Sequence, residues 1–387
     1  MKSWLIEYVK SKRWIYIMYH YVMSAFVNIL RLFVQTDNKL VLFVSYGGRH
    51  FNDSPKCIYE AMKCDNRFKG YKFVWAFRNP NLFKEVENKI KIDTLSYFLV
   101  ALKARVWITN VHIERGLDFA GKHTFYLHTT HTVLPKMMGK HAVEAGCENF
   151  ARLGVAKFDC SCAQCEYEKK LQQEIYDKPE EKIVLTGYPK NDILVHYPQE
   201  KRLAIRKKLG ILADKKIILY APTYRDEKNP KIVCAMNLEK WQTKLGDEYV
   251  ILFRAHPIIA SMMNLPSDSS FVKDVSNYPY NTDLMAISDM LISDYSGIFF
   301  EYGVQDKPMF CYAYDYDEYT KSRKLYFDIR KEIPGGMMNE EELIEYIKDG
   351  DIDDIMKKTT AFRNKYITVY GNATESCLNI IANAIKD

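Results

Sequence analysis

The 387-residue sequence has no low-complexity tract and no long stripe of basic residues. Its net charge is +6 and its lysines and arginines are scattered, so a nucleic-acid duplex is not the expected partner. An anionic membrane or a phosphorylated substrate remains compatible with this charge. Hydrophobic residues make up 48% and charged residues 27% of the chain, which is the balance of a globular protein. A chain of this length is longer than a single hydrophobic core usually supports, so we expect two domains.

A disulfide framework is not indicated either. The nine cysteines are an odd number, no secretory signal precedes them and most lie in apolar segments, which favours reduced thiols in a cytosolic compartment. Cys160, Cys162 and Cys165 have a C-x-C-x-x-C spacing that could start a metal site, but no second Cys or His pair follows at a finger-like distance. No acidic cluster demands a metal, so we expect neither a metal nor a cofactor.

The amino-terminal segment lacks a clean membrane-spanning run. Residues 14–30 carry no formal charge and the stretch ends at Arg31, which is marginal against the roughly 20 apolar residues that a bilayer requires. No small-residue cleavage site follows, which argues against a signal peptide. Polar residues recur at helical spacing along an otherwise apolar cylinder, which predicts an interfacial or protein-docked helix. This polar stripe consists of His20, Ser24, Asn28, Arg31 and Gln35.

Basic residues precede this helix. Lys10, Lys12 and Arg13 are close to its start, and each could add about 1 kcal/mol of attraction to an anionic leaflet. We therefore expect residues 1–37 to form an amphipathic segment that associates with an anionic membrane surface. Packing of its apolar face on the protein's own core is the alternative.

From residue 38 onward, short apolar runs alternate with longer amphipathic stretches, which indicates parallel sheets wrapped by helices. The expected fold is therefore α/β, with two Rossmann-like domains that face one cleft, at residues 38–195 and 196–368. A helix at 369–387 is expected to pack back on the first domain. The expected strands are Leu40–Ser45, Lys72–Phe77, Val106–Asn110, Thr124–Thr129, Ile183–Thr186, Lys216–Pro222, Tyr249–Phe253, Met290–Ser293 and Pro308–Tyr312.

Segments that suit phosphate handling follow three of the later strands. Proline ends one strand before Thr223 and Arg225, whose guanidinium could grip phosphate oxygens bidentately. Ser293 and Asp294 end another strand. Ser296 and Gly297 would then begin a helix whose free amides could bind an anion. One turn further, Glu301 could accept hydrogen bonds from ribose hydroxyls. Taken singly, Ser296 could be a simple helix cap and Arg225 a surface ion pair.

Two histidines lie just past strand ends in opposite domains. His131 follows the strand in the first domain, and His256 belongs to the third such segment, Arg254-Ala255-His256-Pro257, in the second domain. An imidazole has a suitable pKa for removing a proton from a hydroxyl near neutral pH. A structural role for a lone loop histidine is the alternative.

Together these segments resemble the CDP-glycerol glycerophosphotransferase family, which includes the teichoic-acid primases and polymerases. The resemblance runs from about residue 38 to the end of the chain. Its ordered pieces are residues 52–56, 71–75, the segment around His131, 187–192, 220–226, 254–257, 292–302 with 307–308, 326–328 with 334–335, and 371–373.

The resemblance implies a GT-B type fold, monotopic association with the cytoplasmic face of the membrane, and transfer of polyol phosphate with release of CMP. His131 looks like the general base and His256 like a second essential histidine. The partners implied are CDP-glycerol or CDP-ribitol and a lipid-linked acceptor. We place Lys136, and the N-terminal Lys10, Lys12 and Arg13, on the acceptor or membrane side. The residues that look like the donor site are Thr223, Arg225, Ser293, Asp294, Ser296, Gly297 and Glu301.

The sequence departs from the family pattern at two places. The family usually has Trp-His-Gly-Thr-Pro-Leu-Lys around the base, whereas this chain has Thr-His-Thr-Val-Leu-Pro-Lys at residues 130–136. It also has Gly297 where the family usually has a second serine. These differences leave several alternatives open: a ribitol donor, a GT-B glycosyltransferase that uses a nucleotide sugar, or a non-catalytic membrane scaffold. The sequence also leaves open whether the chain forms a homo-oligomer.

Overall fold

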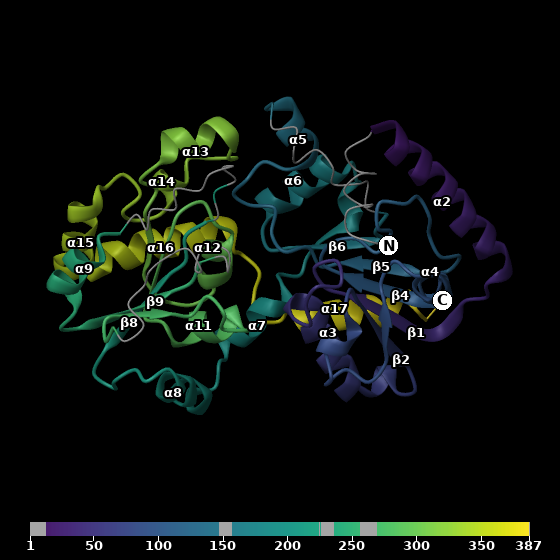
Figure 1. The fold of residues 1–387 in the computed structure, drawn as a ribbon, viewed down its shortest axis with the longest axis horizontal. Helices are drawn as coiled ribbons and strands as arrows, with labels where there is room; N and C mark the ends of the chain where they lie inside the picture. Colours follow the sequence, from purple (N-terminus) through teal and green to yellow (C-terminus); the bar gives the residue numbers. More distant parts are fainter. Residues whose placement is uncertain (1–12, 147–156, 224, 226–235, 256–268, 387) are drawn as a thin grey trace.

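The computed structural model describes residues 13–146, 157–223, 225, 236–255 and 269–386. Two wholly parallel sheets, each with its own helices, form two lobes that lie side by side (Figure 1). We call them the first lobe, built on the seven-stranded sheet, and the second lobe, built on the five-stranded sheet. The prediction of an α/β protein with parallel sheets is confirmed.

The first lobe has the strand order β3-β2-β1-β4-β5-β6-β7. Alternate residues of its interior strand β1 enter different hydrophobic clusters: Leu42 and Val44 belong to one, and Val41 and Phe43 to the other. Both faces of the sheet are therefore buried, as expected for a parallel sheet covered on both sides. Its strands are β1 Asp37–Val44, β2 Lys72–Phe77, β3 Lys89–Lys91, β4 Ala104–Thr109, β5 Phe125–His128, β6 Cys160–Ala163 and β7 Ile183–Leu185.

The second lobe has the order β10-β9-β8-β11-β12. Its strands are β8 Lys216–Tyr220, β9 Tyr249–Phe253, β10 Val272–Asp274, β11 Met290–Ser293 and β12 Met309–Cys311.

The helices connect successive strands and cover the sheets. Those of the first lobe are α2 Arg13–Phe33, α3 Asp53–Cys64, α4 Leu95–Lys103, α5 Gly139–Glu144, α6 Glu166–Tyr176, α7 Pro189–Val195 and α17 Ala373–Ala384, with short 3-10 turns at Asn66–Phe68, Pro80–Leu82 and Glu180–Lys182. Those of the second lobe are α8 Gln199–Lys208, α9 Leu238–Leu245, α11 Asn281–Ile287, α12 Ile298–Tyr302, α13 Tyr316–Ser322, α14 Ile329–Glu332, α15 Glu340–Asp349 and α16 Ile352–Tyr366.

All nine expected strands are present, with ends that differ by up to three residues. Three short strands were not predicted: β3, β6 and β10. Strand β6 contains Cys160 and Cys162, whose side chains are buried in the core of the first lobe. Among the described residues, no group of three or more His, Cys, Asp or Glu side chains is placed to hold a metal ion.

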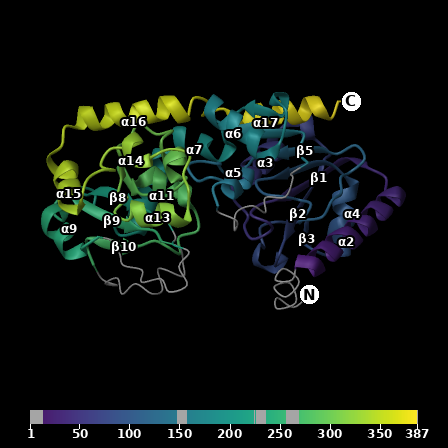
Figure 2. The ribbon, with the colours of Figure 1, turned by 90° about the horizontal axis from the view of Figure 1, so that it is seen from above.

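The C-terminal helix crosses back from the second lobe to the first. Figure 2 shows α16 and α17 following one another along one edge of the molecule. Cys377 and Ile381 of α17 lie in the same hydrophobic cluster as Phe43 of β1. The carboxylate of Asp192, at the α7 end of the first lobe, accepts hydrogen bonds from the Ala373 and Thr374 amides at 3.0 and 2.7 Å. This cap fixes the start of α17 because the first amides of a helix have no partner within it.

The polar stripe of helix α2 faces the protein. His20 Nδ1 lies 2.8 Å from the Gly116 carbonyl, Asn28 donates to the Asp118 carbonyl, and the Ser24 hydroxyl accepts from the Asp118 amide. Apolar residues of α2 lie on both sides: Val27 is buried in the core of the first lobe with Met23 and Leu30 packed against it, whereas Tyr21, Leu32 and Phe33 are exposed. Among the described residues, no helix combines the length and apolar character needed to cross a membrane.

Candidate functional site

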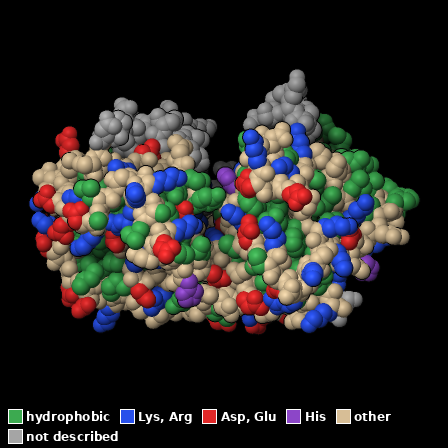
Figure 3. Space-filling view, turned by 90° about the horizontal axis from the view of Figure 1, so that it is seen from below, with side chains coloured by type: hydrophobic (Ala, Val, Ile, Leu, Met, Phe, Trp, Pro, Cys, Tyr) green, Lys and Arg blue, Asp and Glu red, His purple; other side chains and the backbone are tan. Residues whose placement is uncertain are grey.

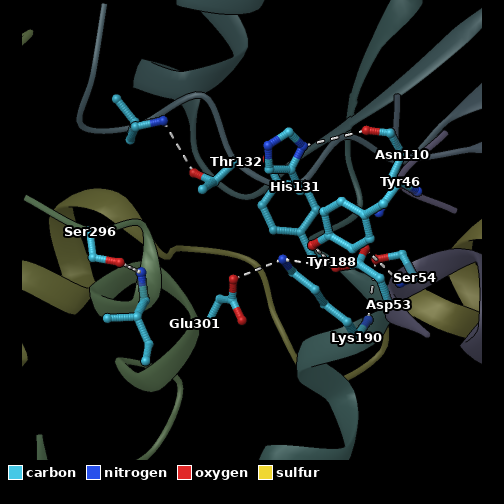
Figure 4. Close-up of polar contacts among 12 residues, drawn as sticks. Tyr46, Asp53, Ser54, Asn110, His131, Thr132, Tyr188, Lys190, Ser296 and Glu301 are labelled. Atoms are coloured by element: carbon cyan, nitrogen blue, oxygen red, sulfur yellow. Dashed lines mark hydrogen bonds and ion pairs between the residues drawn. The ribbon is translucent and has the colours of Figure 1, made fainter. Parts of the chain in front are cut away.

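His131 lies where the first lobe faces the second, just beyond the carboxyl end of β5 (Figure 4). Its Nδ1 is 3.4 Å from the Asn110 carbonyl oxygen, and its ring packs edge-on against Tyr46 at a centroid distance of 5.8 Å. Tyr46 follows β1 and Asn110 follows β4, the strand that lies between β1 and β5 in the sheet. The site therefore forms where parallel strands end together, the usual binding edge of such a fold.

A buried ion cluster that we call the Lys190 cluster lies beside His131. Lys190 Nζ is 3.4 Å from Asp53 Oδ2 and 2.9 Å from Glu301 Oε1. Tyr46 donates its phenolic proton to Asp53 Oδ2 at 2.8 Å. Asp53 and Lys190 come from the first lobe and Glu301 from the second, so the cluster joins the lobes. A buried ammonium held by two carboxylates has its charge compensated, as a charge removed from water requires.

The cluster fixes the ionisation of its members. Burial opposes the charged forms, but the attraction to Asp53 and Glu301 raises the pKa of the Lys190 ammonium well above its usual value. For Asp53 burial is again the opposing effect, and Lys190, the Ser54 amide and the Tyr46 hydroxyl lower the pKa of the carboxyl. Lys190 is therefore protonated and Asp53 ionised near neutral pH.

His131 is held in its neutral form. Burial, and then the charge of Lys190, lower the pKa of the imidazole below its usual value, against the opposing charges of Asp53 and Glu301. A neutral imidazole can accept a proton, which is what general-base catalysis requires.

A buried carboxylate, Glu168 of α6, supports the loop that follows His131. Its Oε1 accepts from the Thr132 hydroxyl and the Val133 amide, both at 3.2 Å, and from the Tyr188 hydroxyl at 2.5 Å. Its Oε2 accepts from the Gln164 amide at 3.1 Å. Burial raises the pKa of the Glu168 carboxyl, although these four donors act in the opposite direction. The hydrogen bonds of the buried Glu168 carboxylate thus hold the His131 loop in place.

Across from His131, the predicted donor residues surround the end of β11. The Ser293 hydroxyl donates to the Ala221 carbonyl at 2.6 Å. Asp294 Oδ1 accepts from the Thr223 and Tyr295 amides at 2.9 and 2.7 Å. Ser293 and Asp294 are buried, so in this arrangement they hold the loop together.

Arg225 is engaged by acids of its own lobe. Its Nε and Nη2 donate to the two carboxylate oxygens of Asp315 at 2.8 and 2.9 Å, and Nη2 also donates to Asp294 Oδ2 at 2.9 Å. With a bond from Nη1 to the Thr223 carbonyl, four of the five guanidinium hydrogens are used. Although burial opposes its charge, Asp294 and Asp315 raise the pKa of Arg225. The phosphate grip expected of Arg225 stays a prediction.

Ser296 and Gly297 lie at the start of α12, and Gly297 lies against Thr132 of the His131 loop. Figure 4 shows Ser296 on the side of the site opposite His131. The Ser296 side chain accepts from the Ile298 amide at 3.2 Å. Glu301, one turn later, reaches across to Lys190. The structure thus brings His131, Glu301, Ser296 and Gly297 to one place between the lobes.

A second connection between the lobes lies on the far side of the His131 loop. Lys136 forms an isolated antiparallel bridge with Leu325, and the Tyr326 amide donates to the Pro135 carbonyl at 2.9 Å. His141 Nδ1 is 3.1 Å from the Tyr326 hydroxyl. Figure 3 shows the surface hollowed between the two lobes.

Four other predicted residues are not placed by these contacts. His256, Lys10 and Lys12 lie outside the described residues, and Arg13 is described only as the first residue of α2. Their predicted roles stay predictions.

Sequence reasoning assigned no role to Tyr46, Asp53, Glu168 or Lys190. Asp53 and Lys190 do stand in segments that carry the family resemblance, 52–56 and 187–192, which was the available signal. Glu168 carried no signal, because an acid on an amphipathic helix normally faces solvent.

Comparison with known proteins gives consistent matches along most of the chain. The model of the family described as CDP-Glycerol:Poly(glycerophosphate) glycerophosphotransferase matches residues 26–383. The chain is 31% identical over 372 residues to the teichoic acid poly(glycerol phosphate) polymerase of Staphylococcus epidermidis, a match that covers 90% of this chain and 51% of that protein. It thus spans about half the length of that relative.

A shorter relative and a solved structure match over nearly their full lengths. The teichoic acid glycerol-phosphate transferase of Staphylococcus aureus is 30% identical over 368 residues, covering 88% of this chain and 92% of that protein. A structure of a variant of the wall teichoic acid polymerase TagF soaked with CDPG superposes with a TM-score of 0.81 at 28% identity, covering 94% of this chain and 93% of that one.

Proposed function

Because the chain belongs to the CDP-glycerol:poly(glycerophosphate) glycerophosphotransferase family, we propose that it transfers polyol phosphate from a CDP-polyol and releases CMP. The expected group is glycerol phosphate, and the expected acceptor is a membrane lipid-linked saccharide or polyol phosphate. The product belongs to a polymer of the teichoic-acid or capsule type.

The observation that carries this proposal is the position of a neutral imidazole between the lobes. His131 lies at the carboxyl ends of the strands of the first lobe, and the loop that follows it contacts Gly297 of the second lobe. We call residues 293–297, which carry predicted donor-binding residues, the donor loop. Transfer between two bound substrates requires a base on one lobe that faces the bound donor on the other.

In the proposed reaction, an acceptor hydroxyl oxygen attacks the polyol-linked phosphorus of the donor. The new O–P bond forms as the bond from that phosphorus to the bridging oxygen breaks, and CMP leaves with that oxygen. His131 takes the hydroxyl proton. Positioning and charge stabilisation carry most of the acceleration, because phosphoryl transfer needs little covalent help from the protein.

The donor binds the second lobe in this proposal. Amides near Ser296 and Gly297, with His256, hold the diphosphate, and Glu301 accepts from ribose hydroxyls. Arg225 holds this loop in position through its ion pairs with Asp294 and Asp315.

Helix α2 supports peripheral association with the cytoplasmic face of the membrane. Several of its large apolar side chains are exposed, with Tyr21, Leu32 and Phe33 exposed to 68%, 69% and 81%. Figure 3 shows hydrophobic side chains gathered at the edge of the molecule where α2 runs in Figure 1. A contiguous apolar face rimmed by polar residues suits a lipid interface.

The test is a parallel incubation of the chain with CDP-glycerol and CDP-ribitol, lipid-linked acceptor and mass detection of all products. CMP together with an acceptor heavier by one or more glycerol phosphate units is the expected result. Extension by ribitol phosphate alone would reassign the donor. Release of CDP or UDP from a nucleotide sugar would instead identify a glycosyltransferase, and binding of a CDP-polyol without turnover would identify a scaffold.

A further inference from the structure

Thr132 of the His131 loop lies against Gly297 of the donor loop, residues 293–297. A Cβ atom on Gly297 would lie 2.7 Å from Thr132 Cγ2 and 3.4 Å from the Leu134 carbonyl oxygen. Real Cβ atoms essentially never come within 3.0 Å of a heavy atom outside their own residue and its chain neighbours. The backbone of Gly297 has φ −64°, which any residue adopts. The need for glycine at this position therefore comes from the neighbouring methyl group.

Thr132 cannot easily move out of the way. Its hydroxyl donates to Glu168 Oε1 and accepts from the Leu134 amide, both at 3.2 Å. These two bonds fix the χ1 angle of a β-branched side chain, which is already stiff. The backbone has φ +81°, which threonine tolerates only where its surroundings hold it. Glu168 is buried and has further donors, so the anchor itself is rigid.

Thr132 and Gly297 lie 165 positions apart in the sequence, and the structure places them in contact across the two lobes.

Building on the proposed function, we propose that Thr132 is a positioning residue whose methyl group, seated against Gly297, sets the spacing between His131 and the donor loop. A side chain at 297 would push the His131 loop away from the start of α12. An error of about 1 Å in such a spacing can cost on the order of a hundredfold in rate. Glu168 acts through Thr132 by keeping the methyl in place.

The test is a set of Gly297→Ala variants in three backgrounds: the natural sequence, Thr132→Ser and Thr132→Val. Serine keeps the hydroxyl that binds Glu168 and removes the methyl, whereas valine keeps the methyl and removes the hydroxyl. For each pair, kcat and the donor KM are measured for CMP release, along with the midpoint of urea unfolding. Each background is compared only with its own Gly297→Ala partner.

Gly297→Ala is expected to lower kcat by at least about tenfold in the natural and Thr132→Val backgrounds, with a smaller change in KM. In Thr132→Ser the same change should cost less than about twofold. The unfolding midpoint should fall in the same pattern. A purely structural glycine would shift the unfolding midpoint equally in all backgrounds without this split between kcat and KM.

Equal losses from Gly297→Ala in all three backgrounds would overturn the proposal, and so would no loss in the natural background. Absence of turnover by the natural chain would instead refute the proposed function. The unfolding midpoints would then still decide the contact: coupling between 132 and 297 supports it, and additivity overturns it.

Discussion

The proton affinity of His131 depends on charges from both lobes. Burial and Lys190 lower the pKa of the imidazole, whereas Asp53 and Glu301 raise it. A base with a lowered pKa stays neutral to a more acidic pH than free imidazole. Activity that depends on neutral His131 should therefore persist below the usual histidine range and decline only as pH falls through the lowered pKa.

Removing one charge at a time should move this decline in opposite directions. Lys190→Met leaves Asp53 and Glu301 uncompensated, which raises the pKa of His131, so the acid limb of kcat/KM moves to higher pH. Glu301→Gln removes a negative charge, so the limb moves to lower pH. Profiles of CMP release from about pH 5 to about pH 8 measure both.

Matched variants separate this effect from damage to the fold. Lys190→Arg keeps the positive charge and should leave the acid limb close to its natural position. Glu332→Gln removes an acid from an ion pair with Lys365 elsewhere in the second lobe and should not move it. If Lys190→Met and Glu301→Gln shift the limb in the same direction, the electrostatic account of His131 is wrong.

The sequence allowed His131 to be predicted because position after a strand is a local signal. It did not allow the Lys190 cluster to be predicted, because its partners are far apart in the chain: Lys190 and Glu301 are separated by 111 positions. Their pairing depends on the packing of two lobes, which no local pattern contains.

At the scale of single elements, helix α2 has apolar side chains on its exposed as well as its buried side: Val27 is buried in the core of the first lobe, whereas Leu32 and Phe33 are exposed. Its hydrogen bonds through His20, Ser24 and Asn28 orient it, and the outward face is apolar. An ordinary surface helix is polar on the side that faces away from the core. The exposed apolar side chains suit contact with the apolar part of a membrane.

Charged substitutions on α2 should therefore weaken membrane association. Leu32→Glu and Phe33→Glu should each reduce partitioning to vesicles that contain anionic lipid by at least about tenfold. Each replaces an apolar side chain that would insert into the lipid with a charged one. Leu203→Glu, at an exposed leucine of α8 in the second lobe (57% exposed), is the control. Co-sedimentation measures the partitioning, and an equal loss in the control would contradict the assignment.

The strands that could be predicted are those with continuous apolar runs, such as Tyr249–Phe253, whose residues are all buried. The missed strands are three or four residues long. Strand β6 reads Cys-Ser-Cys-Ala, without the β-branched or aromatic residues that mark a strand. Its partner strands on both sides supply the structure that its own sequence does not specify.

At the scale of the whole molecule, two lobes are held together around one site. The Lys190 cluster joins them on one side of the His131 loop, and the pairing of residues 135–137 with 324–326 joins them on the other. Helix α17 returns from the second lobe to the core of the first. The sequence predicted the two sheets, but the contacts that set their spacing became visible only in the folded chain.

The most direct test of the central claim compares the natural chain with His131→Ala in CMP release from CDP-glycerol, with lipid-linked acceptor present. Binding of CDP-glycerol is measured on the same preparations by calorimetry. We predict that His131→Ala binds the donor with an affinity close to that of the natural chain and releases CMP at least about a hundredfold more slowly. Turnover by His131→Ala at the natural rate would contradict the account.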